Sequence, residues 1–400
     1  MNQPLTKRIF LNFMQAVLVT DKKTLKQFHR IPSIIYSDDP NYIPHLFQDI
    51  DKLFDPSKNK LLRKGKARRW IFLNENEKLV GRIAAFINPK TAYSGKQPTG
   101  GIGFFECINN QKTADFILDT AKNWLEQEGM EAMDGPINFG ERNQFWGLLI
   151  KNFEAPPSYG MNYNPPYYQK LFENYGFQTY FEQYVYKRPI LMPVQEVFKR
   201  KSKKIKSNEE IRVTNIVGIP LNQVVEDFRT VYNAAWGGHN HFKPITLAAA
   251  QKIIFSLKPV IDPRIVIFAY YRDEPIGFFI NIPELNEIFK YVNGKLNWIG
   301  KLKFLYHKWR QTPRTMVGIV FGVSLDWQGE GVESAMIEWA GNYLTKNTNY
   351  REIVMTWIGD FNPKMLKVCQ NLGAKRFREL KTYRYLFDRT KVFERAPIIT

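Results

Sequence analysis

The stretch Val323-Ser-Leu-Asp-Trp-Gln-Gly-Glu-Gly-Val-Glu333 decides how the fold is interpreted. It follows an apolar, largely β-branched run, Val317 to Phe321, and precedes a segment with apolar residues at helical spacing. This order predicts a strand, a glycine-containing turn and a helix. A helix that starts directly after a strand leaves backbone N–H groups unpaired, and the helix dipole adds partial positive charge there. The Gln328-Gly-Glu-Gly331 turn is therefore a candidate anion site, suited to a phosphate.

The residues after the turn continue this pattern. Apolar residues from Val332 to Tyr343 follow helical spacing, and Ile353 to Ile358 is a second apolar run that predicts a buried strand. Asp360-Phe-Asn-Pro363 then predicts a helix start with Pro at the first helical position, and Gly373 predicts its end. Two glycines after a strand also occur where they serve only a tight turn, and this structural role is the alternative.

Over roughly residues 211 to 388 the chain resembles the GNAT superfamily of acyl-CoA transferases. The family has the motif Gln/Arg-x-x-Gly-x-Gly/Ala after its fourth strand; Gln328 and Gly331 match the first two positions, and Glu333 stands in the third. An Asn near the start of the next helix and a Leu-Gly-Phe at its end are matched by Asn362 and Leu372-Gly373-Ala374. The resemblance implies that this half binds acetyl-CoA or another acyl-CoA. The implied binding residues are Val323, Leu325, Gln328, Gly329, Glu330, Gly331, Val332, Glu333 and Asn362.

Two residues depart from the family pattern. Glu333 lies in the first helical turn, where a carboxylate suits the helix dipole but would repel a pyrophosphate. The family often uses a Tyr in the following helix to protonate the leaving thiolate, and by register Cys369 occupies that position. A thiol could donate a proton, but a Cys on an apolar helix face is also a common core residue.

The resemblance also suggests residues that could take the proton of an amine substrate. Asp360 follows the second apolar strand, and His239 and His241 lie on the loop after the first helix of this half, where the family presents substrate groups. Histidine suits a base near neutral pH, although both histidines could be simple turn residues beside Gly237-Gly238. Glu106 in the first half is a weaker candidate, because a strand carboxylate can also face solvent.

The first half of the chain repeats the same plan. Trp70 to Ile87 predicts a hairpin, Gly101 to Ile108 a strand, and Tyr175-Gly-Phe177 the end of a helix, as in a GNAT domain. Gln178 to Arg188 is expected to form the final hairpin. Asn110-Gln-Lys-Thr113 stands where the glycine turn would be. The first half therefore resembles a GNAT domain without the cofactor turn.

The predicted fold class is α+β, with two tandem GNAT-like domains. The resemblance implies that each is a mixed, mostly antiparallel twisted sheet with helices on both faces. We expect residues 1–195 to form the domain without the pyrophosphate turn, residues 196–210 a basic linker, and residues 211–400 the domain with the acyl-CoA-binding turn. Residues 284–313 form a helical, basic and aromatic insertion in the second domain.

A long segment without regular pattern, residues 136–166, interrupts the first half. It is rich in aromatic residues, which are costly to leave exposed, so we expect an ordered loop that lines a pocket. Arg142 could hold a carboxylate or phosphate, and Asn143, Tyr163 and Asn164 could hydrogen-bond a substrate. The alternative is a loop that only packs over its own domain.

Composition limits the possible classes of protein. The 400 residues suffice for two cores, and no apolar run is long enough to span a bilayer. The first residues lack the apolar segment of a signal peptide, so a cytoplasmic location is expected. Cys107 and Cys369 lie far apart and indicate no disulfide framework or metal site. The net charge of +19 is consistent with solvated basic faces, with attraction of CoA, or with a polyanionic partner such as tRNA or anionic lipid.

The resemblance to the GNAT superfamily implies an acyl-CoA-dependent N-acyltransferase, most simply an acetyltransferase. It would move the acyl group to an amine on a small molecule or polypeptide by direct attack. One alternative is a Fem-like transferase that uses aminoacyl-tRNA, where the positive charge would serve RNA. Another is a binding protein that keeps the fold without catalysis. The sequence does not identify the amine acceptor or the oligomeric state.

Overall fold

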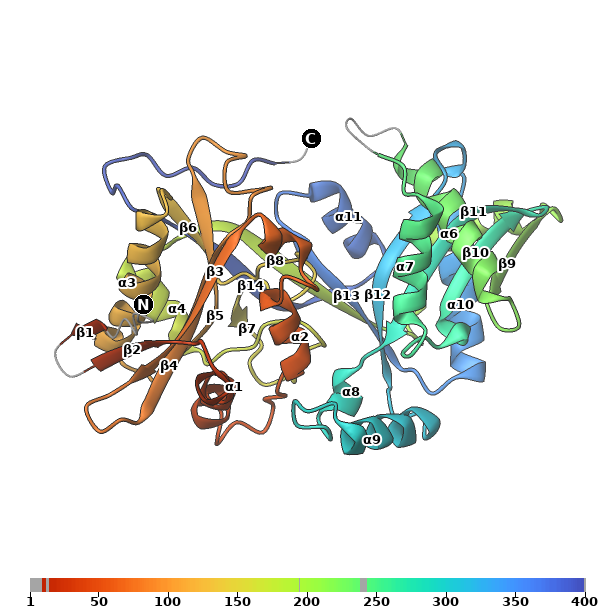
Figure 1. The fold of residues 1–400 in the computed structure, drawn as a ribbon. Coiled ribbons are helices and arrows are strands. Elements are labelled where there is room, and N and C mark those ends of the chain that lie inside the picture. Colours follow the sequence, from red (N-terminus) through yellow and green to blue (C-terminus); the bar gives the residue numbers. More distant parts are fainter. Residues whose placement is uncertain (1–8, 12–13, 194, 238–242, 399–400) are drawn as a thin grey trace.

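One continuous sheet runs through the whole molecule in the computed structural model, which describes residues 9–11, 14–193, 195–237 and 243–398 (Figure 1). Its strand order is β1-β2-β3-β4-β5-β6-β14-β8-β13-β12-β11-β10-β9, with β7 paired to β14. Helices cover both faces on each side of the centre. The α+β class with two similar halves is thus confirmed.

The first half contains seven strands and four α-helices in the described residues, among them three very short strands. The strands are β1 (Ile9–Leu11), β2 (Met14–Leu18), β3 (Lys66–Leu73), β4 (Leu79–Ile87), β5 (Thr99–Cys107), β6 (Ala132–Gly135) and β7 (Leu148–Lys151). The helices are α1 (Lys22–Ile35), α2 (Phe47–Asp51), α3 (Gln111–Gln127) and α4 (Tyr167–Tyr175). The inner faces of α3 and α4 share one apolar core with β3 and β4, while α1 and α2 pack on the opposite face.

The second half follows the same arrangement. Its strands are β9 (Ile211–Asn215), β10 (Val266–Tyr271), β11 (Glu274–Pro283), β12 (Thr315–Val323) and β13 (Glu352–Gly359). Its helices are α6 (Leu221–Trp236), α7 (Leu247–Leu257), α8 (Asn286–Phe289), α9 (Trp298–Trp309), α10 (Val332–Asn347) and α11 (Pro363–Asn371). Alternate residues of β10 point to opposite faces: Ile267 packs with α10, and Phe268 packs with α6 and α7. Residues 284–313, expected as a helical insertion, contain α8 and α9.

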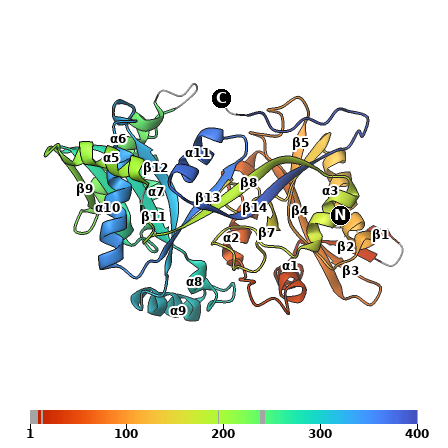
Figure 2. The same cartoon turned by 180° about the vertical axis from the view of Figure 1, so that it is seen from behind.

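The two halves exchange strands at the centre of the sheet. β8 (Gln178–Pro189) follows the first half but pairs with β13 of the second, and β14 (Lys375–Leu386) follows the second half but pairs with β6 and β7 of the first. β8 and β14 also pair with each other, and both lie between the halves in the two views (Figures 1 and 2). The expected hairpin over Gln178 to Arg188 is therefore wrong. This segment has no Gly, Asn or Asp to make a turn, so it continues as one strand.

The basic segment expected as a linker is largely helical. Residues 196–206 form α5 (Glu196–Lys206), which packs against α10. Two ion pairs link the helices and the turn before α10: Lys206 Nζ lies 2.7 Å from Glu338 Oε1, and Lys204 Nζ lies 2.6 Å from Glu330 Oε2. The charge run thus lies beside the cofactor turn that the sequence suggested. Within the described ranges, no helix has the length and apolarity needed to cross a membrane.

Candidate functional site

A wedge opens between two parallel strands in the second half. β12 and β13 pair only from Thr315 to Gly318, opposite Glu352 to Met355. Beyond Gly318, β12 stays paired with β11 as far as Val323, whereas β13 follows β8. The two strands therefore diverge, and the edge of β12 that faces β13 has no strand partner over Ile319 to Val323 in the described structure.

Mostly apolar side chains, together with Arg188 and Thr356, line a cavity of about 190 Å³ inside this wedge, here called the apolar cavity. The strands contribute Phe321 and Ile358, and α10 contributes residues along its length, including Ile337, Gly341 and Leu344. Because a helix rises about 1.5 Å per residue, the cavity follows α10 for about 10 Å. Its walls suit a hydrocarbon chain better than a polar group.

A second cavity, of about 440 Å³, lies at the mouth of the wedge beside the glycine turn, and is here called the turn cavity. It is lined by Trp236 of α6, by the end of β12, by Gln328 and Gly329 of the turn, and by Lys201 of α5. Phe321, Ile337, Met365 and Val368 line both cavities, so the two adjoin. A molecule with a charged end and an apolar chain could occupy both.

The two glycines of the turn have left-handed backbone conformations, with φ of 80° at Gly329 and 111° at Gly331. Gly331 is the N-cap of α10, and a Cβ there would lie 2.7 Å from the carbonyl oxygen of Lys201. A Cβ at Gly329 would have no atom within 4 Å. Gln328 Nε2 donates to the Val323 carbonyl at 3.0 Å, which ties the turn to β12. A side chain at Gly331 would therefore disturb the packing of α5 against this turn, whereas the space around Gly329 is open.

Glu333 and Lys201 set the charge at this turn. Glu333 Oε1 accepts a long, 3.4 Å hydrogen bond from the Gly329 N–H, so it occupies a donor that an anion would use. Glu330 is held by Lys204, which lowers the pKa of the Glu330 carboxyl. Lys201 contributes a positive charge from α5 at the cavity wall. The long hydrogen bond of Glu333 is one that a phosphate could displace.

The structure describes two of the four suggested catalytic residues, Asp360 and Cys369. Asp360 Oδ2 pairs with Arg395 at 2.5 Å, and neither adjoining cavity includes Asp360 in its lining. Cys369 is buried, its Sγ lies 3.6 Å from Met355 Sδ, and burial raises the pKa of its thiol to about 11. The thiol therefore stays protonated at neutral pH, and Cys369 also lines the apolar cavity. His239 and His241 lie outside the described residues.

The other residues that the resemblance implies for cofactor binding differ in exposure and in local role. Asn362 caps α11, because its side chain accepts from the Met365 N–H at 3.2 Å. Val332 is buried in the core beneath α10, so only its backbone could reach a ligand. Leu325 is largely exposed in a short 3₁₀ turn (Leu325–Trp327) before Gln328.

The suggested substrate residues of the long loop do not meet in one pocket. Tyr163 OH lies 2.7 Å from Asp39 Oδ2 and 2.8 Å from the Phe153 carbonyl oxygen, two acceptors that share its one hydrogen. The Asn164 amide group bonds the backbone of Leu149 through both its oxygen and its nitrogen. These contacts hold the loop itself. Arg142 lines a separate polar cavity with Asp134 and Arg384, and Asn143 is exposed.

A wedge like that of the second half is filled in the first half. β5 and β6 pair only from Thr99 to Gly101. Beyond this pairing, Ile137 lies beside β5, and its N–H donates to the Ile102 carbonyl at 2.7 Å. A Cβ on Gly103 would lie 1.7 Å from the Ile137 carbonyl oxygen, so no ligand fits between. At the start of α3, the Asn110 side chain caps the Thr113 N–H. Part of the loop thus fills the wedge of its own half, while Arg142 lines the polar cavity.

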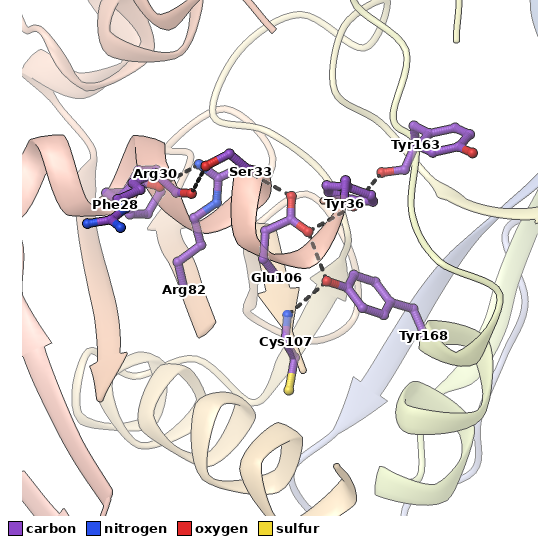
Figure 3. Close-up of polar contacts among 9 residues, drawn as sticks. All are labelled: Phe28, Arg30, Ser33, Tyr36, Arg82, Glu106, Cys107, Tyr163 and Tyr168. Carbon is purple, nitrogen blue, oxygen red and sulfur yellow. Dashed lines mark hydrogen bonds and ion pairs between the residues drawn. The ribbon is translucent and has the colours of Figure 1, made fainter. Parts of the chain in front are cut away.

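The first half contains a buried polar network around Glu106 (Figure 3). Its Oε2 accepts from Tyr36 OH and Tyr168 OH, both at 2.8 Å, and its Oε1 lies 3.2 Å from Arg82 Nη2. Arg82 Nη1 also donates to the Phe28 carbonyl at 2.8 Å. Burial raises the pKa of Glu106, and Arg82 opposes that shift. Glu106 therefore faces the interior. Its partners escaped sequence reasoning, although Arg82 is the one charged residue within the apolar strand β4.

Arg82 also lines a cavity of about 600 Å³ with Tyr42 and His45, between α1, the segment before α2 and the loop before α9. Burial, and then the positive charge of Arg82, lower the pKa of His45 to about 4. The unfolded chain has the ordinary value of 6.5 and therefore binds this proton first as pH falls.

Lowering the pH from about 7 to about 5 should thus reduce the free energy of unfolding through His45 by up to about 2 kcal/mol. The free energy of unfolding falls as pH drops from the unfolded pKa of His45, 6.5, toward its folded pKa of about 4, and His45 makes no such contribution above this range. Urea titrations at both pH values would measure it, with His45→Gln as the comparison. An equal pH dependence in the variant would contradict this role of His45.

Comparisons with known proteins agree with this architecture. No protein-family model matches the chain. It is 24% identical over 379 residues to a protein named bacterial ceramide synthase from Caulobacter vibrioides (strain NA1000 / CB15N), covering 92% of this chain and 97% of that one. It is 25% identical over 370 residues to protein YghO of Escherichia coli (strain K12), covering 91% and 93%.

Solved structures share the fold at low sequence identity. A tandem GNAT protein from the clavulanic acid biosynthesis pathway has a TM-score of 0.53 and 9% identity, covering 94% of this chain and all of that one. A GCN5-related glucosamine N-acetyltransferase region of a fungal multi-domain β-N-acetylglucosaminidase has a TM-score of 0.54 and 13% identity, covering 94% of this chain and 38% of the larger protein. The chain thus has the tandem fold of GNAT acetyltransferases.

Proposed function

We propose that this chain, which has the tandem GNAT fold, is an acyl-CoA-dependent N-acyltransferase whose reaction takes place in the β12–β13 wedge. The observation that carries the proposal is the pair of adjoining cavities there, one at a glycine turn and one apolar. The turn and Lys201 would hold the pyrophosphate of CoA. The free edge of β12 would pair with the pantetheine arm through backbone hydrogen bonds.

The apolar cavity supports a fatty acyl group rather than acetyl. Two carbons would leave most of its length along α10 unfilled, and burial of each further methylene group contributes about 0.8 kcal/mol. The relative from Caulobacter is named a ceramide synthase, and a ceramide is the amide of a fatty acid with a long-chain amino alcohol. We therefore place a long-chain amine first among the acceptors.

The chemistry requires one displacement. The amine nitrogen attacks the thioester carbonyl carbon, the new C–N bond forms, and the C–S bond breaks. The amine loses one proton and the leaving thiolate gains one. Backbone N–H groups at the edge of β12 could stabilise the negative charge that develops on the carbonyl oxygen. Asp360 is ion-paired with Arg395, so its use as the base would require that pair to open.

The first test measures free-thiol release from acetyl-CoA and long-chain acyl-CoA, each with and without a long-chain amino alcohol. We expect amine-dependent release that is faster with the long chain. A response to aminoacyl-tRNA in place of acyl-CoA would support the Fem-like alternative. Thermal stabilisation by acyl-CoA without turnover would support a binding protein.

Filling the cavity should change the preference for acyl length. Gly341→Leu places a side chain into the cavity wall, where the nearest atom to a new Cβ is the Ile190 carbonyl oxygen at 4.0 Å. We expect kcat/KM for long-chain acyl-CoA to fall by about tenfold or more, because overpacking costs about 1–3 kcal/mol, while acetyl-CoA is little affected. Gly341→Ala is the matched control, since it improves helix propensity in the same way but adds one methyl group. An equal fall in kcat/KM for long-chain acyl-CoA and acetyl-CoA would mean that the acyl group does not bind in this cavity.

A further inference from the structure

The outer face of α9 carries a continuous apolar stripe. Trp298 is 71% exposed, Leu302 56%, Leu305 59% and Trp309 76%. These residues recur at helical spacing, so they lie along one line of the helix, with Ile299 and Tyr306 beside it. So many large apolar side chains grouped on one exposed helix indicate a binding surface.

The opposite face of α9 anchors the helix to the protein. Phe304 is buried and packs with Phe289 and Val292 in the small core formed around α8. Figures 1 and 2 show α9 along the lower edge of the molecule, outside the sheet and its covering helices. The helix is therefore fixed in place. Its apolar stripe is exposed, and at its C-terminal end Leu305 and Trp309 also line a cavity of about 510 Å³ beside residues 260–264.

Basic residues flank the stripe on both sides. Residues 290–314 contain seven basic and no acidic residues: Lys290, Lys295, Lys301, Lys303, Lys308, Arg310 and Arg314. At about 100° per residue, Lys301 and Lys308 border one side of the stripe, and Lys303 and Arg310 border the other. The Nζ atoms of Lys303 and Lys308 also donate to backbone carbonyls at the base of the helix.

We propose that α9 docks the protein onto an anionic phospholipid bilayer. The Trp, Leu and Ile side chains would enter the boundary between headgroups and acyl chains, and the flanking Lys and Arg would face lipid phosphates. A second copy of the chain is a poorer partner, because two such faces would repel each other. A nucleic acid would leave Ile299, Leu302 and Leu305 exposed. The proposal does not depend on acyltransferase activity.

Co-sedimentation with phosphatidylcholine vesicles, with and without phosphatidylglycerol, tests this docking. We expect the full chain to bind the anionic vesicles and to lose binding as salt increases. Leu302→Gln should lower the partition coefficient about tenfold or more, whereas Leu191→Gln, at a side chain 63% exposed elsewhere, should not. Lys301→Gln should lower binding to anionic vesicles about fivefold and leave binding to neutral vesicles unchanged.

All three side chains are exposed, so the variants should unfold at the temperature of the unchanged protein, which circular dichroism checks. Equal vesicle binding by Leu302→Gln and Leu191→Gln would overturn the proposal. So would the absence of vesicle binding together with concentration-dependent self-association that Leu302→Gln abolishes in ultracentrifugation.

Discussion

Glu106→Ala should lower the free energy of unfolding by about 3 to 5 kcal/mol, because it leaves the Arg82 guanidinium charged and buried without its partner. The Tyr168 hydroxyl would also lose its acceptor, and the Tyr36 hydroxyl would keep only the Tyr163 carbonyl oxygen, at 3.1 Å. Urea unfolding followed by circular dichroism would measure the change.

Two controls test whether the destabilisation comes from the buried, unpaired charge of Arg82 or would follow the removal of a carboxylate anywhere in the protein. Glu394→Ala removes the partner of Lys96 in a largely exposed ion pair and should change stability little. Arg82→Met combined with Glu106→Leu should be less destabilising than the sum of the two single changes, since it removes both charges. A small effect of Glu106→Ala would mean that water or rearranged neighbours satisfy Arg82.

Gly329→Asp should weaken CoA binding by about tenfold or more relative to Gly329→Asn. Both side chains tolerate the left-handed backbone at this position, and a Cβ there meets no atom within 4 Å. The pair therefore differs mainly in one negative charge beside the proposed pyrophosphate, which is worth several kcal/mol at close range near a protein surface. Isothermal titration calorimetry with CoA would give both dissociation constants.

Gly218→Asp is the control for charge at a distance, because Gly218 has a similar φ of 81° and open space around its Cβ position. It should leave CoA binding unchanged. Gly331 would give a less informative result, since a side chain there would displace the Lys201 backbone. Equal dissociation constants for Gly329→Asp and Gly329→Asn would show that CoA does not bind at this turn.

The local elements around the turn could be predicted from sequence because short-range patterns determine them. Apolar runs, a cap at Asn362 and glycines at Gly331 and Gly373 each depend on neighbours within a few residues. The α+β class followed from the resemblance to the GNAT superfamily, which the order of these elements supports. The strand exchange has no such signal, because the pairing of β14 with β6 joins residues far apart in the chain.

Charge and polarity were the least reliable guides to the site. The run of lysines before residue 207 looked like a solvated linker, yet its spacing buries Ile205 and builds α5 against α10. Tyr163 and Asn164 looked like ligand contacts, but backbone groups of their own loop use them. Glu106 could have faced solvent, but the structure buries it. Its burial could not be predicted because its partners Tyr36, Arg82 and Tyr168 come from three separate segments.

The exchange of β8 and β14 also sets an order for folding during translation. The sheet of the first half needs β14, whose residues 375–386 are synthesised only after the other strands of the second half. Until then β6 and β7 present an open edge, which invites pairing with other chains. A premature stop codon before residue 375 would therefore damage the half of the protein that had been synthesised first.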